Sequence, residues 1–264
     1  MSSIPEMFKN QKYVVFNDVI SREMANLMTD YLFVKRDAGL LVPPVAMGGD
    51  DQQCPLSWSI YGDPLFDTLL ARLAPQLSNL IGVELVPAYT YSRIYQTGEE
   101  LKYHKDRPSC EISGTLTLGR KQGEPIWPIY VGRNENDTVG KQIDLDVGEM
   151  LLYRGCDVPH WRPVYKGEWQ AQVFVHYVDA NGPYAEECKF DGRPVLGMPK
   201  TQQVAMKQQQ SNYERDTQNQ NFQQVEQNQQ KLQKPWLKTQ EETMISSRPS
   251  GRPLPQNFEF KVGE

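Results

Sequence analysis

The chain has 264 residues, of which 39% are hydrophobic, and its formal net charge is −5 at pH 7. This length accommodates one large β domain, or one domain with an appendage. The acidic balance argues against a nucleic-acid-binding surface, because such surfaces are normally basic. No apolar run approaches about 18 residues, the length that predicts a membrane helix. We therefore expect a protein without nucleic-acid or membrane partners.

The first residues and the cysteine spacing indicate the compartment. The chain begins without the basic and apolar leader of a secreted protein. Its four cysteines lie far apart and show no CxxC spacing, which argues against a disulfide framework and a zinc knuckle. They are Cys54, Cys110, Cys156 and Cys188. These features predict a cytoplasmic protein.

Helical periodicity marks two segments in the first third of the chain. Ser21 is a suitable N-cap for an amphipathic helix over 22–33. Asp63 and Pro64 begin a second helix, whose leucines share one face until Gly82 ends it. The rest of this part is predicted as a short strand, a long Gly- and Pro-rich loop and another strand, over 12–16, 36–57 and 58–61.

After residue 86 the helical periodicity disappears. Six short runs rich in Tyr, Thr, Val and Ile are separated by Gly, Pro and Asp turns, as in a β-sandwich or barrel. These runs are 88–95, 112–118, 125–131, 142–145, 149–153 and 170–178. Because the helices come first in the sequence and a β-roll follows them, the sequence predicts an α+β fold.

The composition changes again near Gly197. Residues 201–230 are dominated by Gln and Asn and hold too few apolar side chains to bury a core. We expect 198–264 to be a Gln-rich tail, partly helical or disordered, that could join copies of the chain into a homo-oligomer. It is not expected to form a second globular domain.

Two histidines and an aspartate have the spacing of a metal site. In an extended strand, residues two apart point to the same face, so His104 and Asp106 can bind one ion. His160 can complete the site from another strand. Two imidazoles and one carboxylate are the ligand set of non-haem Fe(II) oxygenases. The HxD pair alone also fits a solvated turn, and His176 is interpreted as a structural histidine.

Around these residues the sequence resembles the 2-oxoglutarate/Fe(II)-dependent dioxygenases, in particular the prolyl-4-hydroxylase-like branch. That family shows a tyrosine strand, a Gly turn, an HxD motif and a distal histidine. Here they are Arg93-Ile94-Tyr95, Gly98, His104-Lys105-Asp106 and His160. The resemblance covers about 86–178 and implies a double-stranded β-helix (jelly roll) with an N-terminal helical support layer. The expected domain is 1–197, with its helical layer at 20–82 and its β core at 86–180.

The resemblance also implies an activity. Such an enzyme would use Fe(II), 2-oxoglutarate and O₂, with ascorbate as an optional addition, to hydroxylate an unactivated C–H bond. Succinate and CO₂ would be the co-products, and His104, Asp106 and His160 the catalytic metal ligands. The substrate could be a prolyl or other protein residue, or a small molecule. The alternative is a non-catalytic jelly-roll scaffold that works through its Gln-rich tail.

The cosubstrate's far carboxylate requires a cation, and Arg forms the best-matched fork. The family usually supplies a basic residue at the start of the final strand, but 167–172 contains no Lys or Arg. Arg162 has the same strand parity as His160 and is the favoured partner, with Lys166 and Arg93 as alternatives. By resemblance, the hydroxyl of Tyr95 also binds 2-oxoglutarate.

Overall fold

A computed structural model describes residues 3–41, 43, 54–198 and 261–262. The expected Gln-rich tail lies almost wholly outside these residues, and so does half of the expected 36–57 loop. Across the described ranges, no helix combines the length and apolar character needed to cross a membrane.

Three helices precede the β-rich part: α1 (Ile4–Gln11), α2 (Arg22–Asp37) and α3 (Pro64–Ile81). The caps of α2 and α3 are those that the sequence predicts, Ser21 and Asp63. Helix α1 was not predicted, because it is too short to show a clear period. Its signal is a capping box, in which Ser3 and Glu6 bond each other's backbone N–H groups.

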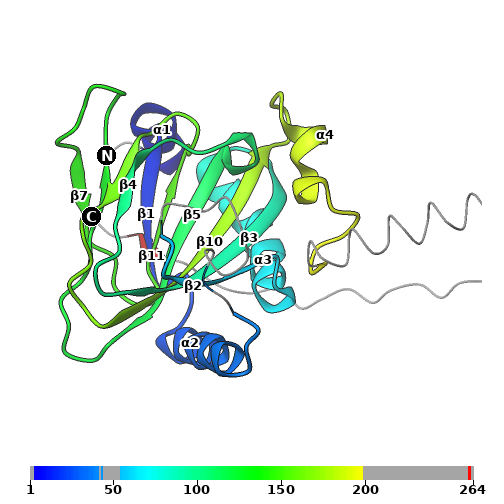
Figure 1. Cartoon of the computed structure of the whole chain (residues 1–264). Helices are drawn as coiled ribbons and strands as arrows, with labels where there is room; N and C mark the ends of the chain where they lie inside the picture. Colours follow the sequence, from blue (N-terminus) through cyan, green and yellow to red (C-terminus); the bar gives the residue numbers. More distant parts are fainter. Residues whose placement is uncertain (1–2, 42, 44–53, 199–260, 263–264) are drawn as a thin grey trace, which may run out of the picture. The chain divides into compact units, whose positions relative to one another are not determined.

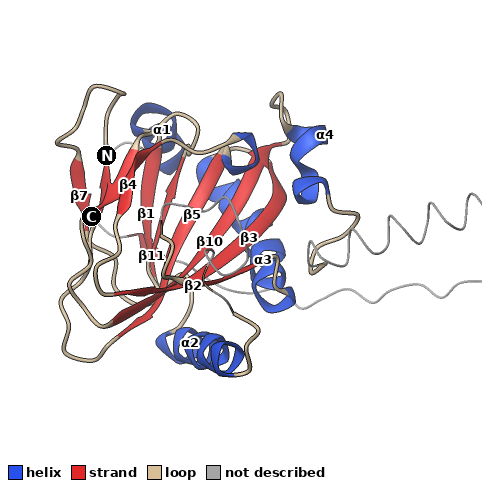
Figure 2. Ribbon diagram, in the orientation of Figure 1, coloured by secondary structure: helices blue, strands red, loops and turns tan. Residues whose placement is uncertain are grey.

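The strands form two antiparallel sheets (Figures 1 and 2). The larger sheet has the order β11-β1-β8-β5-β10-β3-β2, and the smaller has the order β4-β9-β6-β7. The larger sheet contains β1 (Tyr13–Asn17), β2 (Trp58–Tyr61), β3 (Leu85–Gln96), β5 (Ile112–Arg120), β8 (Met150–Tyr153), β10 (Trp169–Asp179) and β11 (Lys261–Val262). The smaller contains β4 (Leu101–His104), β6 (Ile129–Val131), β7 (Lys141–Ile143) and β9 (His160–Arg162).

Two of the predicted strands are shorter than expected. The 125–131 run is strand only at Ile129–Val131, because Pro125 and Pro128 cannot donate to a ladder. The 142–145 run is replaced by Lys141–Ile143. The smaller sheet is therefore made of very short strands.

Alternation along the strands gives the larger sheet two different faces. One face packs on α2 and α3 in the main core, with Leu116, Val173 and Val175 beside Leu32 and Leu70. The opposite face of β3 and β10 carries aromatic and polar residues that line a cavity: Tyr89, Tyr91, Arg93, Tyr95, Phe174 and His176. The helical layer thus supports the sheet from outside and leaves its inner face for a site.

Side chains from the two sheets meet between them. Ile129 and Ile143 of the smaller sheet pack with Leu151 of the larger sheet. Farther along, Leu101 of β4 packs in one cluster with Tyr95 of β3. The sheets therefore enclose the roll interior, and the inner-facing residues of both can reach one site.

Candidate functional site

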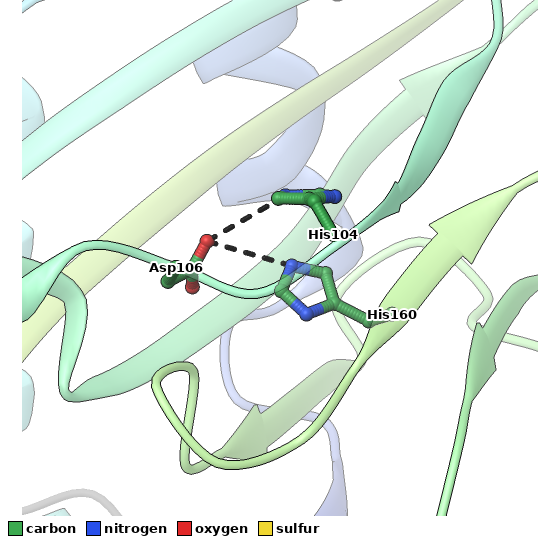
Figure 3. A group of neighbouring side chains, drawn as sticks. All are labelled: His104, Asp106 and His160. Carbon is green, nitrogen blue, oxygen red and sulfur yellow. Dashed lines mark ion pairs between the residues drawn. The ribbon is translucent and has the colours of Figure 1, made fainter. Parts of the chain in front are cut away.

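The three predicted metal ligands come together at one end of the roll. His104 is the last residue of β4, and His160 is the first residue of β9. These strands pair antiparallel with His104 opposite His160, which places their ring centroids 4.2 Å apart. Asp106 follows β4 and directs its Oδ1 at both rings, at 3.6 Å from Nε2 of His104 and 3.5 Å from Nε2 of His160 (Figure 3).

The hydrogen bonds of the two imidazoles determine which nitrogens face Asp106 as acceptors. Nδ1 of His104 lies 2.7 Å from the carbonyl oxygen of Lys102, and Nδ1 of His160 lies 3.0 Å from that of Val158. A carbonyl oxygen only accepts, so each Nδ1–H donates and each Nε2 keeps its lone pair. Two nitrogen lone pairs and a carboxylate oxygen therefore converge, an arrangement that a cation stabilises.

The carboxylate of Asp106 is held on several sides. Its backbone N–H donates to the carbonyl of Gly155 at 2.9 Å, and the hydroxyl of Ser113 lies 2.9 Å from Oδ2. A Cβ on Gly155 would lie 2.3 Å from Oδ2, so only glycine fits there. Burial opposes ionisation of Asp106, but in the metal-free protein the neighbouring histidines, His160 and His104 first, outweigh it when they are protonated and lower the pKa of the carboxyl to about 2. Oδ1 is therefore the oxygen of Asp106 that remains available to coordinate a metal ion.

A cavity of about 430 Å³ opens beside the three ligands. Tyr153 lines this cavity together with the three predicted ligands, and its hydroxyl lies 3.3 Å from Nε2 of His160. Burial raises the pKa of Tyr153 well above its usual range, so the phenol keeps its proton as a donor. The cavity combines aromatic walls with a few polar groups, as small-molecule sites do.

Arg162 is a buried cation that does not itself line this cavity, although two residues that do line it, Tyr95 and Tyr153, interact with its charge. Its side chain is 1% exposed, packs over the ring of Trp127 at 5.0 Å and donates from Nη1 to the carbonyl of Trp127 at 2.5 Å. Within the described part of the chain, its Nε and Nη2 have no hydrogen-bond partner, and it forms no ion pair with a carboxylate. Burial lowers the pKa of Arg162, while Tyr95 and Tyr153 act in the opposite sense. A guanidinium with two open donors fits a ligand carboxylate.

The structure separates the other cosubstrate candidates. Lys166 is exposed and does not line the cavity. Arg93 does line it, 4.9 Å from the ring of Tyr91 and 5.7 Å from the ring of Tyr95. Tyr95 is fully buried and also lines the cavity. Of the three candidate cations, Arg93 therefore lines the cavity, Arg162 is buried and interacts with its lining residues Tyr95 and Tyr153, and Lys166 is exposed.

A segment that the sequence did not mark contacts Arg107, one of the residues that line the cavity. Asp191 accepts two hydrogen bonds from Arg107, at 2.8 and 3.0 Å, and Arg107 follows the ligand Asp106 directly. Phe190 and Asp191 both have left-handed backbone angles, with φ of 53° and 55°. Arg193 anchors this segment through a buried ion pair with Asp67 at 2.7 Å. The segment therefore has a fixed place beside the site.

The third histidine lies outside the ligand group but close to it. Nδ1 of His176 is 2.9 Å from the hydroxyl of Ser113, and its ring packs against Tyr89 with centroids 4.4 Å apart. A donor atom of His176 also lies within 4.8 Å of donor atoms of Asp106 and Cys110. Sequence reasoning missed Ser113, for which the only signal was its place on the inner face of β5.

Acid should destabilise the metal-free protein through His176. Burial lowers the pKa of this imidazole to about 4, from 6.5 in an unfolded chain. The unfolded state therefore takes up the proton first as the pH falls, so the free energy of unfolding decreases between pH 6.5 and pH 4. The full effect is about 3 kcal/mol. Urea unfolding at pH 7 and at pH 5 should show a smaller loss in His176→Phe than in the wild type. An equal loss would assign the effect to other groups.

No protein-family model matches the sequence, and no curated protein matches it either. Solved structures do match the fold. A prolyl-4-hydroxylase from Pseudomonas putida aligns at 15% identity over 66% of this chain and 97% of its own, with a TM-score of 0.53. The α-ketoglutarate-dependent carbocyclase SnoK of nogalamycin biosynthesis aligns at 12% identity over 75% and 93%, with a TM-score of 0.54.

A third similar structure is an oxidoreductase of the 2OG-Fe(II) oxygenase family from Burkholderia pseudomallei. It aligns at 13% identity over 69% of this chain and 91% of its own, with a TM-score of 0.50. All three are 2-oxoglutarate- and Fe(II)-dependent oxygenases, a class that has a jelly-roll fold. The described part of the chain therefore has the jelly-roll fold of this class of protein.

Proposed function

We propose that this protein is an Fe(II)- and 2-oxoglutarate-dependent dioxygenase that hydroxylates an unactivated C–H bond. The observation that carries the proposal is the convergence of His104, Asp106 and His160 at a cavity that they line, together with the buried open donors of Arg162 next to its lining residues Tyr95 and Tyr153. The fold alone would also suit a binding protein. In addition to the fold, the three predicted ligands could bind iron, and Arg162 could bind the far carboxylate of 2-oxoglutarate.

The ligand atoms fit Fe(II). Nε2 of His104, Nε2 of His160 and Oδ1 of Asp106 would hold the ion on one side and leave its other positions open. When bound, Fe(II) supplies the activation of O₂. The carbonyls behind both imidazoles keep each Nε2 directed at the ion.

The overall reaction balances as 2-oxoglutarate, O₂ and R–H giving succinate, CO₂ and R–OH. One oxygen atom enters succinate and the other enters the hydroxyl group. Loss of CO₂ from the keto acid provides two of the four electrons that O₂ requires, and the C–H bond provides two. No further reductant is needed for a coupled turnover.

The protein's own residues bind and orient the cosubstrate. Arg162 would pair with the far carboxylate, and Tyr95 would donate its hydroxyl to the same dicarboxylate. The aromatic side chains of Tyr91 and Phe174 form part of the cavity wall and lower the local polarity, which strengthens such charge-assisted bonds.

For the substrate, we infer a protein or peptide residue, with a prolyl group as the specific candidate and a small molecule as the alternative. The prolyl-4-hydroxylase among the similar structures supports the first choice, and the carbocyclase of nogalamycin biosynthesis supports the second. Hydroxylation assays with proline-containing peptides and with small molecules would separate them.

Optical spectroscopy without oxygen tests the proposed cofactors. Anaerobic addition of Fe(II) and 2-oxoglutarate should give a weak metal-to-ligand charge-transfer band in the visible region, and admission of O₂ should remove it and form succinate. A correctly folded protein without this band would instead favour the scaffold function.

The Gln-rich tail offers a second test of the scaffold alternative. All proposed ligands precede the tail, so a chain ending at Lys200 should still convert 2-oxoglutarate to succinate in the uncoupled reaction, although it also loses β11, the edge strand that pairs with β1. This end point lies just beyond Gly197 and keeps the hydrogen bond from Arg193 to the carbonyl of Met198. The full chain is the control, and circular dichroism checks the fold. A folded but inactive truncation would show that the tail takes part in the site.

A further inference from the structure

His176 is a buried side chain that the proposed reaction does not use. It stands on the inner face of β10, where it pairs with Ser113 of β5, and Ser113 pairs in turn with Tyr153 of β8. This row of residues crosses the sheet directly behind the three ligands. Ser113 is fully buried in the middle of the row.

The hydroxyl of Ser113 connects His176 to the ligand Asp106. Its Oγ lies 2.9 Å from Oδ2 of Asp106 and 2.9 Å from Nδ1 of His176. It also lies 3.0 Å from the carbonyl of Cys110. The hydroxyl has one proton to donate, so these contacts restrict its direction.

The chemistry of the two possible acceptors, Asp106 and the carbonyl of Cys110, decides which of them receives the proton of Ser113. An ionised carboxylate accepts only, and it is a stronger acceptor than the neutral carbonyl of Cys110. Ser113 therefore donates its proton to Oδ2 of Asp106, and its oxygen accepts the Nδ1–H of His176. Burial lowers the pKa of His176 to about 4, so at neutral pH the ring carries a single N–H, which this bond assigns to Nδ1.

We propose that Ser113 and His176 are positioning residues that fix the carboxylate of Asp106 so that Oδ1 alone faces the metal. The inference rests on the proposed metal site, and it concerns how that site is organised. Gly155 closes the space beside Oδ2, because even a Cβ there would lie 2.3 Å from this atom. With Oδ2 held by the hydroxyl, Asp106 offers one oxygen to the ion and the other positions stay open for cosubstrate.

The same neighbourhood contains a competing arrangement, in which Asp106, Cys110 and His176 would bind a metal ion. Two contacts argue against it. The hydroxyl of Ser113 already occupies the space between Asp106 and His176, and Sγ of Cys110 lies 3.1 Å from the hydroxyl of Tyr89. Burial also raises the pKa of Cys110 well above its usual range, which keeps a neutral thiol instead of the thiolate that metals bind.

Binding of Co(II) to the metal-free full chain tests the role of Ser113, by calorimetry and by the visible d–d spectrum. Ser113→Ala should weaken Co(II) binding by about 10- to 100-fold, with one ion still bound and an altered spectrum. Thr115→Val is the matched control, because Thr115 is another buried hydroxyl on the same face of β5 and bonds Gln172 at 3.3 Å. Its affinity and spectrum should be unchanged. Wild-type affinity in Ser113→Ala would overturn the proposal.

Two variants of His176 separate its hydrogen bond from its packing. His176→Phe keeps a ring against Tyr89 and should weaken Co(II) binding, whereas His176→Asn keeps an N–H donor near Nδ1 and should restore most of it. Equal weakening in both would overturn the hydrogen-bonding role. Cys110→Ala should leave Co(II) binding unchanged. If this variant failed to bind Co(II), the ion would belong to the competing arrangement. If these results hold while Fe(II) and 2-oxoglutarate give no charge-transfer band, the proposed function fails and the positioning role stands.

Discussion

His104→Ala and Asp106→Ala should each abolish iron retention and succinate formation. The three ligand atoms lie on one side of the site, so removing one leaves two donors, too few for a stable protein–iron complex. Asp106→Ala also removes the negative charge that the two imidazoles face at 3.6 and 3.5 Å. Iron content after desalting and succinate release under air are the two measurements.

The third histidine provides the control for this experiment. His176→Ala should still retain one iron ion per chain, although more weakly, because His176 contacts Asp106 only through Ser113. Its succinate formation should recover when Fe(II) is added in excess. A complete and irreversible loss in a folded His176→Ala variant, equal to that in His104→Ala, would mean that the ligand group is misassigned.

Arg162→Ala should raise the apparent KM for 2-oxoglutarate strongly while Fe(II) still binds. A dicarboxylate held at the metal by one end places its other charge inside the roll, where an unpaired carboxylate is costly. Losing a buried charge-assisted pair typically costs about 2–5 kcal/mol, which is roughly 30-fold or more in affinity. Initial rates of succinate formation against 2-oxoglutarate concentration, at saturating Fe(II), measure the effect.

Variants of neighbouring cations sharpen this result. Lys166→Ala removes an exposed charge and should leave the KM unchanged. Arg162→Lys keeps the charge but loses the planar fork, so it should give an intermediate KM. If Arg162→Ala has the wild-type KM, Arg162 is not the carboxylate partner, and Arg93 becomes the residue to test because it lines the cavity.

The sequence by itself determined the elements that depend on local signals. Helices α2 and α3 follow from apolar periodicity and from their caps, Ser21 and Asp63. The run of β-prone segments separated by turns after residue 86 indicated a β-sandwich or barrel, and the structure adds β1 and β2 from the first part of the chain to its larger sheet. Short-range spacing also predicted that His104 and Asp106 would share one side of a strand; the two do converge, but β4 ends at His104 and Asp106 lies in the loop that follows.

Only the tertiary structure decided which distant residues meet. The pairing of β4 with β9 places His104 opposite His160, and no local signal contains this register. Arg162 and Lys166 are near each other in sequence, yet one is buried and the other exposed, because only Arg162 belongs to β9.

The contact of His176 with Ser113 likewise depends on the register of β10 against β5. Hydrogen bonds across a sheet are long-range in sequence, so a pattern can predict a residue's face but not its partner. For this reason the sequence predicted which residues could bind a metal, whereas the pairing of strands was needed to find Ser113 and His176, which we propose position Asp106.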